Sequence, residues 1–417
     1  MDFQKIYNRL YPYQKEALAF LESKKGRALL SLDMGLGKTV TALAYAALCR
    51  ETKSWESLII LCPSSVTIHW FNHIREWLKV RRKDIKIIEK REDLVYLIEK
   101  NSLKILPYSI LSRNENLIRS FIKSIKTDIF IIDELHYCKN PSSSRSKIAN
   151  AISKASSKVI GLTGTPMPNT PEEIIPQIEI ITGTKIGRSE PSEVFKKFVY
   201  RKTAREVFKD MPSFKRVVIP VKPSEKAIEL SRITEAVWNK VTEREKHISA
   251  FRKEAFHNKK EAVFEILEQS LNSYPKVVVF CWHHDTVEAI KEWCHQKELS
   301  YSCITGKTPS SQRENEISRF WNDKDCRVFI GNIIAAGTGL NLQVANICIF
   351  AELDFVPENL RQAEKRIHRI GSQLPCFAYY VVCKDTIEEK IVSTLNRKFF
   401  AIQKILRDED HKFIEIT

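Results

Sequence analysis

The 417-residue chain is long enough to bury two or three domain cores, and its 43% hydrophobic and 28% charged residues are typical of a globular protein. Its apolar runs are too short for a membrane helix, its ten cysteines include no CxxC pair, and its N-terminus lacks a signal-peptide pattern. We therefore expect an intracellular protein with reduced thiols, no membrane partner and no zinc site. The net charge of +16 predicts an anionic partner, with nucleic acid favoured over an acidic membrane surface.

A glycine-rich segment directly follows the apolar run 28–32. It comprises Asp33, Met34, Gly35, Leu36, Gly37, Lys38 and Thr39. Glycines let the backbone amides turn toward phosphate oxygens, Lys38 would neutralise the β and γ phosphates, and Thr39 would offer its hydroxyl to Mg²⁺. The strict consensus has another glycine where Leu32 stands, so the pattern is met in its looser form. A chance strand-turn-helix is the alternative, but the pattern favours nucleotide binding.

Short apolar, β-rich runs alternate with amphipathic helical stretches in two parts of the chain, which predicts two parallel α/β lobes. The first set of expected strands is 28–32, 58–62, 103–106, 129–132 and 158–163. The second set is 276–281, 301–305, 327–331, 347–351 and 376–382. We expect an N-terminal lobe at 1–205, a linker and helical insertion at 206–272, and a C-terminal lobe at 273–417 that ends in a helix from 387 to about 406.

The segment between the lobes has two parts. Pro212, Pro220 and Pro223 bracket a stretch that we expect to be an extended linker. Residues 225–269 carry apolar side chains in a charged background and predict one or two helices. These helices either pack on a lobe, which is favoured, or form a partner-binding arm.

An acidic pair, Asp133 and Glu134, follows the apolar run 129–132. Behind a phosphate loop, such a pair serves nucleotide hydrolysis: Asp133 would hold Mg²⁺ through water, and Glu134 would orient and deprotonate the attacking water. An Asp-Glu pair can also simply cap a following helix. Beside Lys38 and Thr39, the catalytic interpretation is favoured.

With these residues the chain resembles a superfamily 2 helicase-type ATPase whose second motif is DELH. Further segments resemble the family's other motifs in the same order: LYPYQ at 10–14, PSS at 63–65 with Trp70, LTGTP at 162–166, AGTGLN at 336–341 and QAEKRIHRIG at 362–371. The resemblance implies two RecA-like lobes with a short helical insertion between them, and ATP and Mg²⁺ as cofactors. It implies that Gln14 reads adenine and assigns Gly337 and Gln362 to the nucleotide site.

The sixth motif supplies the expected arginine finger. Gln362, Arg366 and Arg369 are spaced by four and three residues, which would place them on one face of a helix. The planar guanidinium stabilises charge on a transferring γ-phosphate, so we expect Arg369 to be the finger with Arg366 beside it. The alternative is an ordinary basic helix face.

Within superfamily 2 the motifs resemble the SWI/SNF-type branch, and the tracts 280–284, 304–310 and 350–353 are most similar to its annealing-helicase subgroup. The insertion is short, and Ser372 separates Gly371 from Gln373, where the branch usually runs directly from Gly to Gln. The resemblance implies a monomeric, DNA-stimulated ATPase that translocates on double-stranded DNA, located wherever that DNA is. Alternatives are a strand-separating helicase on DNA or RNA, with single strands as partner, and an ATP-dependent DNA clamp with little hydrolysis.

A motor that tracks DNA without regard to sequence should contact phosphates through hydroxyls, amides and basic groups. The candidate contacts are Ser64, Ser65, Tyr108, Ser109, His283, Thr305 and Thr338. For each, a role as helix cap or turn residue is the alternative. Trp70 and Trp77 could stack on bases, but their spacing of seven residues favours core packing.

Overall fold

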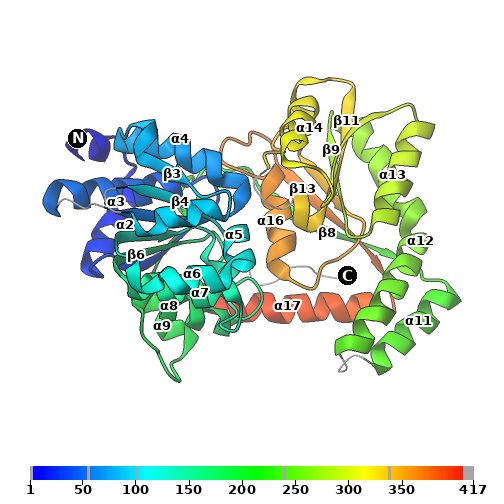
Figure 1. Cartoon of the computed structure of the whole chain (residues 1–417). Coiled ribbons are helices and arrows are strands. Elements are labelled where there is room, and N and C mark those ends of the chain that lie inside the picture. Colours follow the sequence, from blue (N-terminus) through cyan, green and yellow to red (C-terminus); the bar gives the residue numbers. More distant parts are fainter. Residues whose placement is uncertain (1–2, 54–56, 100–101, 238–240, 337–339, 407–417) are drawn as a thin grey trace. The chain divides into compact units, whose positions relative to one another are not determined.

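The computed structural model describes residues 3–53, 57–99, 102–237, 241–336 and 340–406. The chain divides into two compact units, Met1–Lys209 and Asp210–Thr417 (Figure 1). The segment 206–272, expected between the lobes, therefore belongs almost entirely to the second unit. Within the described ranges, no helix has both the length and the apolar character needed to cross a membrane.

The first unit is built on a seven-stranded sheet with the order β3-β4-β2-β5-β6-β1-β7, in which every pairing is parallel. The strands are β1 Arg27–Leu32, β2 Leu58–Cys62, β3 Ile85–Ile87, β4 Leu103–Pro107, β5 Thr127–Ile132, β6 Ser156–Leu162 and β7 Val199–Lys202. The five strands expected here are confirmed. The two strands that were not expected lie at the sheet edges, where a three-residue strand and a polar one give little hydrophobic pattern.

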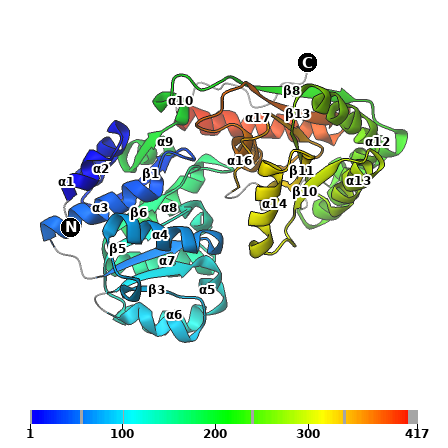
Figure 2. The same cartoon turned by 90° about the horizontal axis from the view of Figure 1, so that it is seen from above.

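Ten α-helices of this unit lie in the described residues. They are α1 Phe3–Asn8, α2 Pro12–Ser23, α3 Lys38–Lys53, α4 Thr67–Leu78, α5 Tyr108–Arg113, α6 Glu115–Phe121, α7 Ser144–Lys154, α8 Ile174–Thr182, α9 Pro191–Phe198 and α10 Ala204–Val207. A hydrophobic core joins α1 to α4 with one set of strand side chains, including Leu30, Ile60 and Ile131. The views in Figures 1 and 2 show further helices, α7 and α8 among them, across the sheet from α3. The central strands are buried on both faces, which explains their continuous apolar sequences.

The second unit contains a six-stranded parallel sheet with the order β10-β11-β9-β12-β13-β8. Its strands are β8 Phe214–Val221, β9 Val277–Cys281, β10 Ser300–Ile304, β11 Cys326–Asn332, β12 Ile347–Phe350 and β13 Cys376–Cys383. The expectation of an extended linker bracketed by prolines is wrong for β8, which pairs with β13 along its whole length. Pro220 is tolerated there because β8 is an edge strand with one free side.

The helices of the second unit are α11 Glu225–Ala236, α12 Val241–Ser273, α13 His284–Gln296, α14 Ser310–Asn322, α15 Ile333–Ala336, α16 Pro357–Ile367 and α17 Ile387–Leu406. The charged segment thus forms α11 and α12, and α17 is the expected terminal helix. Helix α12 packs on this unit: Phe251 and Val263 are fully buried, and Lys259 Nζ donates to Glu388 Oε1 at 2.7 Å and to Val381 O at 3.0 Å. The packed interpretation of the insertion therefore fits this unit.

A buried ion pair fixes α16, the helix of the sixth motif, to the sheet. Arg216 in β8 donates two hydrogen bonds to the Glu364 carboxylate, at 2.7 and 2.9 Å. The hydroxyl of Tyr380 in β13 donates to the same carboxylate at 2.7 Å. Since Glu364 is 3% exposed, these donors satisfy a charge that water hardly reaches.

We predict that Arg216→Met lowers the free energy of unfolding by about 3 kcal/mol, because Glu364 is left buried without its cation. Guanidinium unfolding of the full chain, followed by circular dichroism, measures the change. The control is Lys253→Met, which removes an exposed ion pair with Asp285 and should cost much less, because solvent screens such pairs. Equal costs for the two variants would contradict the role given to Arg216.

Candidate nucleotide site and nucleic-acid contacts

The phosphate loop lies at the carboxyl end of β1 and leads into α3, which begins at Lys38. Gly35 and Gly37 have φ values of +85° and +70°, in the left-handed region that favours glycine. A Cβ atom on Gly37 would lie 2.5 Å from Gln14 Nε2. Lys38 Nζ donates to Leu32 O at 3.0 Å, so its ammonium group lies back across the loop that precedes it.

Gln14 of α2 is tied to the phosphate loop. Its Nε2 donates to Leu36 O at 3.2 Å, and its Oε1 accepts from Tyr11 N at 3.0 Å. The hydroxyl of Tyr13 donates to the same Leu36 carbonyl at 3.2 Å. In this structure Gln14 therefore holds the loop, and its reading of adenine stays a prediction.

Asp33 opens the loop, and its position ties the loop to the end of the first unit. Its carboxylate accepts from Ala204 N at 3.1 Å, and its amide donates to Lys202 O at 3.1 Å. The side chain is 8% exposed. This geometry gives Asp33 a role in shaping the loop; its contact with nucleotide stays a prediction.

The acidic pair follows β5, which is separated from β1 only by β6. Asp133 Oδ2 accepts from Trp70 Nε1 at 2.8 Å, and Oδ1 accepts from Glu134 N at 3.0 Å. Burial and the Glu134 charge raise the pKa of the Asp133 carboxyl above its ordinary value, while the Trp70 hydrogen bond and the Lys38 ammonium act in the opposite direction. The structure thus brings Lys38 within electrostatic reach of Asp133.

Glu134 has an unusual backbone and a polar neighbourhood. Its φ of +47° is positive, a conformation that non-glycine residues adopt at a cost and that is concentrated at functional sites. His136 Nδ1 lies 3.3 Å from Glu134 Oε2 and 3.0 Å from Thr163 Oγ1. Thr163 also accepts from Thr165 N at 3.0 Å. These contacts connect the acidic pair to the third motif, which follows β6.

The residues present fit a magnesium ion. Mg²⁺ in nucleotide sites keeps several waters and binds one or two protein oxygens besides phosphates. Thr39, at the start of α3, offers a hydroxyl, and each Asp133 oxygen retains a lone pair beyond its hydrogen bond. Within the described ranges no group of three or more His, Cys, Asp or Glu side chains could hold a metal ion.

In the second unit, Arg366 and Arg369 converge on one carbonyl. Arg366 Nη1 and Arg369 Nη1 donate to Leu340 O at 3.2 and 3.4 Å. Arg366 is 3% exposed, and burial lowers the pKa of the Arg369 guanidinium. Both side chains therefore lie against the end of the fifth motif, whose Gly337 and Thr338 fall outside the described residues.

The expectation that Gln362, Arg366 and Arg369 share one helix face is wrong for Arg369. Helix α16 ends at Ile367, because His368 leaves helical geometry with φ −103° and ψ +97°. Gln362 and Arg366 lie on the helix, and Arg369 lies in the segment beyond it. Arg369 is thus placed by a turn, in which its amide donates to Ser372 Oγ at 3.1 Å.

The candidate nucleic-acid contacts of the first unit separate into exposed and buried residues. Ser64, Ser65 and Ser109 are exposed, and Ser64 Oγ lies 2.8 Å from Ser109 Oγ. Tyr108 is only 3% exposed, and its hydroxyl donates to Asp133 O at 2.9 Å. The prediction of a direct contact through Tyr108 is therefore corrected: its side chain has no surface to offer and supports the acidic pair from inside.

Of the three candidate contacts in the second unit, Thr338 lies outside the described residues and the other two have local partners. His283 Nδ1 lies 2.5 Å from Glu352 Oε1, and its Nε2 lies 3.3 Å from Ser249 Oγ. Thr305 is part of a turn in which its amide donates to Thr308 Oγ1 at 2.9 Å. Thr305 has the turn role that was the alternative, whereas the His283 side chain makes no cap hydrogen bond. Contact of either residue with nucleic acid stays a prediction.

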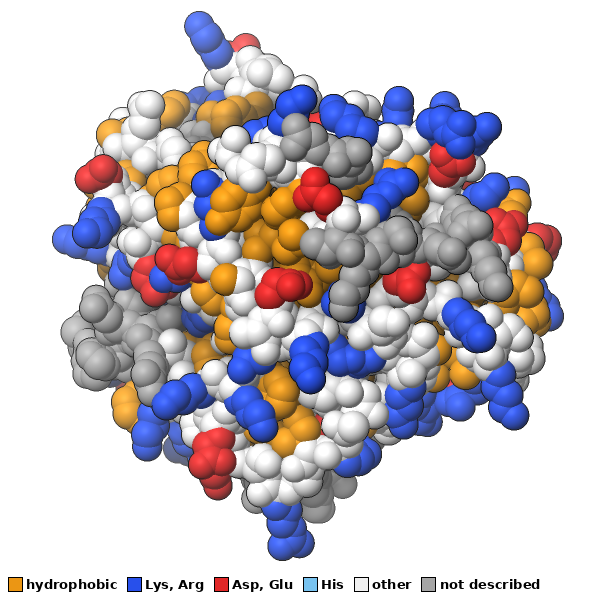
Figure 3. All heavy atoms as spheres, turned by 90° about the vertical axis from the view of Figure 1, so that its left-hand side faces the viewer, with side chains coloured by type: hydrophobic (Ala, Val, Ile, Leu, Met, Phe, Trp, Pro, Cys, Tyr) orange, Lys and Arg blue, Asp and Glu red, His pale blue; other side chains and the backbone are white. Residues whose placement is uncertain are grey.

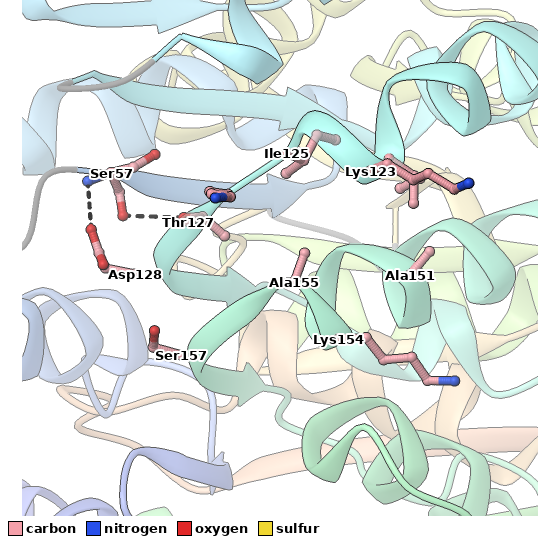
Figure 4. Close-up of a pocket in the computed structure, with 11 residues that line it drawn as sticks. Ser57, Lys123, Ile125, Thr127, Asp128, Ala151, Lys154, Ala155 and Ser157 are labelled. Atoms are coloured by element: carbon pink, nitrogen blue, oxygen red, sulfur yellow. Dashed lines mark hydrogen bonds between the residues drawn. The ribbon is translucent and has the colours of Figure 1, made fainter.

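An open hollow of about 680 Å³ lies elsewhere on the first unit (Figure 4). Ser57, Thr127 and Ser157 line it at the amino ends of β2, β5 and β6, whereas the phosphate loop and acidic pair lie at carboxyl ends. None of the predicted site residues lines it.

On the face drawn in Figure 3, lysine and arginine side chains are spread among acidic and hydrophobic ones rather than gathered in one patch.

The sequence did not reveal the role of Trp70 at this site. Core packing is confirmed for it and for Trp77, which are 0% and 8% exposed, but the hydrogen bond from Trp70 to Asp133 was not expected. The order of the strands could have indicated this hydrogen bond, because helix α4 follows β2 and β2 lies next to β5. A tryptophan early in that helix can reach the carboxyl end of β5.

We predict that Gly37→Ala weakens nucleotide binding about tenfold or more, because a side chain at φ +70° is strained and meets Gln14. Titration of a fluorescent ATP analogue measures the affinity. Gly306→Ala is the control, since nothing lies within 4 Å of a Cβ atom at that position. Unchanged affinity in Gly37→Ala would show that the loop takes another conformation with nucleotide bound.

Comparison with known proteins shows the same two parts. Residues 13–274 match the SNF2-related domain, and residues 258–371 match the helicase conserved C-terminal domain. The mouse protein "DNA annealing helicase and endonuclease ZRANB3" is 28% identical over 95% of this chain and 41% of its own length. A Caenorhabditis elegans homologue of "SWI/SNF-related matrix-associated actin-dependent regulator of chromatin subfamily A-like protein 1" is 29% identical over 97% of this chain and 63% of its own.

Among solved structures, the Sulfolobus solfataricus SWI2/SNF2 ATPase core in complex with dsDNA is similar, with a TM-score of 0.45 and 19% identity over 95% of this chain and 93% of that one. The chain spans about two fifths of the length of the mouse relative. The family match covers more than half of this chain, from residue 13 to residue 274, and includes the phosphate loop and the acidic pair. The chain belongs to the SNF2-related family.

Proposed function

We propose that this protein is a DNA-stimulated ATPase motor that translocates on double-stranded DNA and remodels or anneals DNA or protein-DNA complexes. The observation that carries the proposal is the meeting of Lys38, the acidic pair and Thr163 at one edge of a parallel sheet, in a chain of the SNF2-related family. The names of the relatives, a DNA annealing helicase and a SWI/SNF-related protein, support DNA as the partner. The net charge of +16 agrees with it.

Each predicted catalytic residue of the first unit has a role in the proposed hydrolysis of ATP. Lys38 exchanges its hydrogen bond with Leu32 O for the β and γ phosphates of ATP. Glu134, oriented by His136, takes the proton of the attacking water. Thr39 and, through water, Asp133 would hold Mg²⁺, which when bound would neutralise charge that develops on the phosphates.

Arg369, in the second unit, is proposed as the arginine finger, with Arg366 beside it. Both side chains now donate to Leu340 O, a neutral acceptor that a γ-phosphate would outcompete. Because Arg369 lies beyond the end of α16, its position depends on the turn that follows the helix. Gln362 and Gly337 are proposed to complete the nucleotide contacts.

We predict that duplex DNA raises the rate of phosphate release and that Lys38→Ala abolishes it, because the β and γ phosphates lose their neutralising cation. Phosphate release is measured with duplex DNA, single-stranded DNA and RNA in parallel. The control is Lys123→Ala, which should keep wild-type rates. Lys123 is exposed and lines the hollow at the amino ends of the strands, away from the phosphate loop.

Absence of stimulation by duplex DNA would overturn the proposal. Stimulation by single strands or RNA, together with displacement of a fluorescent strand from a forked duplex, would instead support a strand-separating helicase. Tight binding of DNA and ATP with almost no turnover would support a clamp.

We predict that Arg369→Ala lowers kcat on the order of 10³-fold, because arginine fingers act on charge that appears in the transition state. Affinity for a fluorescent ATP analogue should change only a few-fold. Arg319→Ala, an exposed arginine of α14, serves as the control. Equal loss of binding and turnover in Arg369→Ala would assign Arg369 to ground-state binding and remove it as the finger.

A further inference from the structure

Two buried aromatic residues from two different helices donate hydrogen bonds to Asp133. Trp70 in α4 is fully buried, and its Nε1 donates to Asp133 Oδ2 at 2.8 Å. Tyr108, the first residue of α5, is 3% exposed, and its hydroxyl donates to Asp133 O at 2.9 Å. Neither side chain takes part in the reaction steps described above, yet both contact the residue proposed to hold Mg²⁺.

Both aromatic residues are close in sequence to exposed serines at the start of the same helices. Ser64 opens the 3-10 turn Ser64–Val66 that leads into α4, and Thr67 Oγ1 donates to Ser64 O at 3.0 Å. Ser109 directly follows Tyr108. Since Ser64 Oγ and Ser109 Oγ lie 2.8 Å apart, the two helix starts are joined at the surface.

The hydrogen bonds on Asp133 leave its side chain little freedom. Trp70 fixes one carboxylate oxygen and Glu134 N fixes the other, while Tyr108 fixes the main-chain carbonyl. Donors of this kind orient a metal ligand, and their removal typically costs 10- to 100-fold in metal affinity or activity. A small shift of α4 or α5 would therefore change the orientation of the Asp133 carboxylate.

We propose that Trp70 and Tyr108 are positioning residues that transmit the engagement of Ser64, Ser65 and Ser109 by the DNA backbone to the orientation of Asp133. The proposal rests on the proposed function, because it concerns how DNA stimulates that reaction. The chemical class recognised at the surface is the phosphodiester backbone, which serine hydroxyls can contact without regard to sequence. The signal is carried inside the first unit, from the starts of α4 and α5 to the end of β5.

The test compares Trp70→Phe and Tyr108→Phe with the matched control Trp77→Phe. Tyr108→Phe keeps the ring and Trp70→Phe keeps an aromatic side chain of smaller size, and each removes the donor to Asp133. Trp77 is also buried on α4, but its ring contacts the Arg9 guanidinium at 4.2 Å rather than the acidic pair. All three variants are measured by thermal unfolding, by Mg²⁺ dependence of fluorescent ATP-analogue binding, and by phosphate release with and without duplex DNA.

We expect Trp70→Phe to raise the Mg²⁺ concentration needed for half-maximal nucleotide binding on the order of tenfold, and to reduce the ratio of DNA-stimulated to basal turnover by a similar factor. Tyr108→Phe should reduce that ratio with a smaller effect on Mg²⁺, because it acts through the main chain. Trp77→Phe should change both quantities less than about twofold even if its melting temperature falls.

A wild-type Mg²⁺ requirement and a wild-type stimulation ratio in Trp70→Phe would overturn the proposal. Changes that follow the loss of melting temperature equally in Trp70→Phe and Trp77→Phe would also overturn it, because they would show a structural role only. If the wild-type protein is not stimulated by duplex DNA, the proposed function fails and coupling to DNA fails with it. The Mg²⁺ titration still decides whether Trp70 positions Asp133.

Discussion

The parallel pairing of β5, β6 and β1 is the constraint on which the candidate site depends. Because parallel strands end at one edge of a sheet, three loops far apart in the sequence emerge side by side there. They carry Lys38 after β1, Asp133 after β5 and Thr163 after β6. The helices on the faces of the sheet bury the strands that hold this edge in place, and the hollow of Figure 4, at the other edge, shares none of these residues.

Burial then gives the site its rigidity. A carboxylate as deeply buried as that of Asp133 is costly unless it is hydrogen-bonded, and the Trp70 indole and the Glu134 backbone amide each donate to one of its oxygens. The Tyr108 phenol donates to the main-chain carbonyl of the same residue. The same solution recurs in the second unit, where Arg216 and Tyr380 satisfy Glu364. In both units a buried acidic side chain fastens a motif to the sheet.

Local sequence patterns were sufficient to predict the phosphate loop, ten of the thirteen described strands and the terminal helix. Gly35 and Gly37 have positive φ values that favour glycine, and the central strands are apolar because both of their faces are buried. Both features can therefore be recognised in the sequence. Strand β8 lacks a continuous apolar pattern in the sequence, because an edge strand tolerates Pro220 and exposed polar residues. The end of α16 before Arg369 and the bond from Trp70 to Asp133 depend on contacts between distant segments, which spacing does not encode.

The segment that joins the two units is hydrogen-bonded at one end to the phosphate loop and at the other to helix α16. Just before the boundary, Ala204 N is bonded to Asp33 of the phosphate loop. Just after it, Arg216 is bonded to Glu364 on the helix that precedes Arg369. Residues 204–216 therefore act as a tether of at most about 40 Å when fully extended. While both bonds hold, the length of this segment sets an upper limit on the distance between the phosphate loop and helix α16.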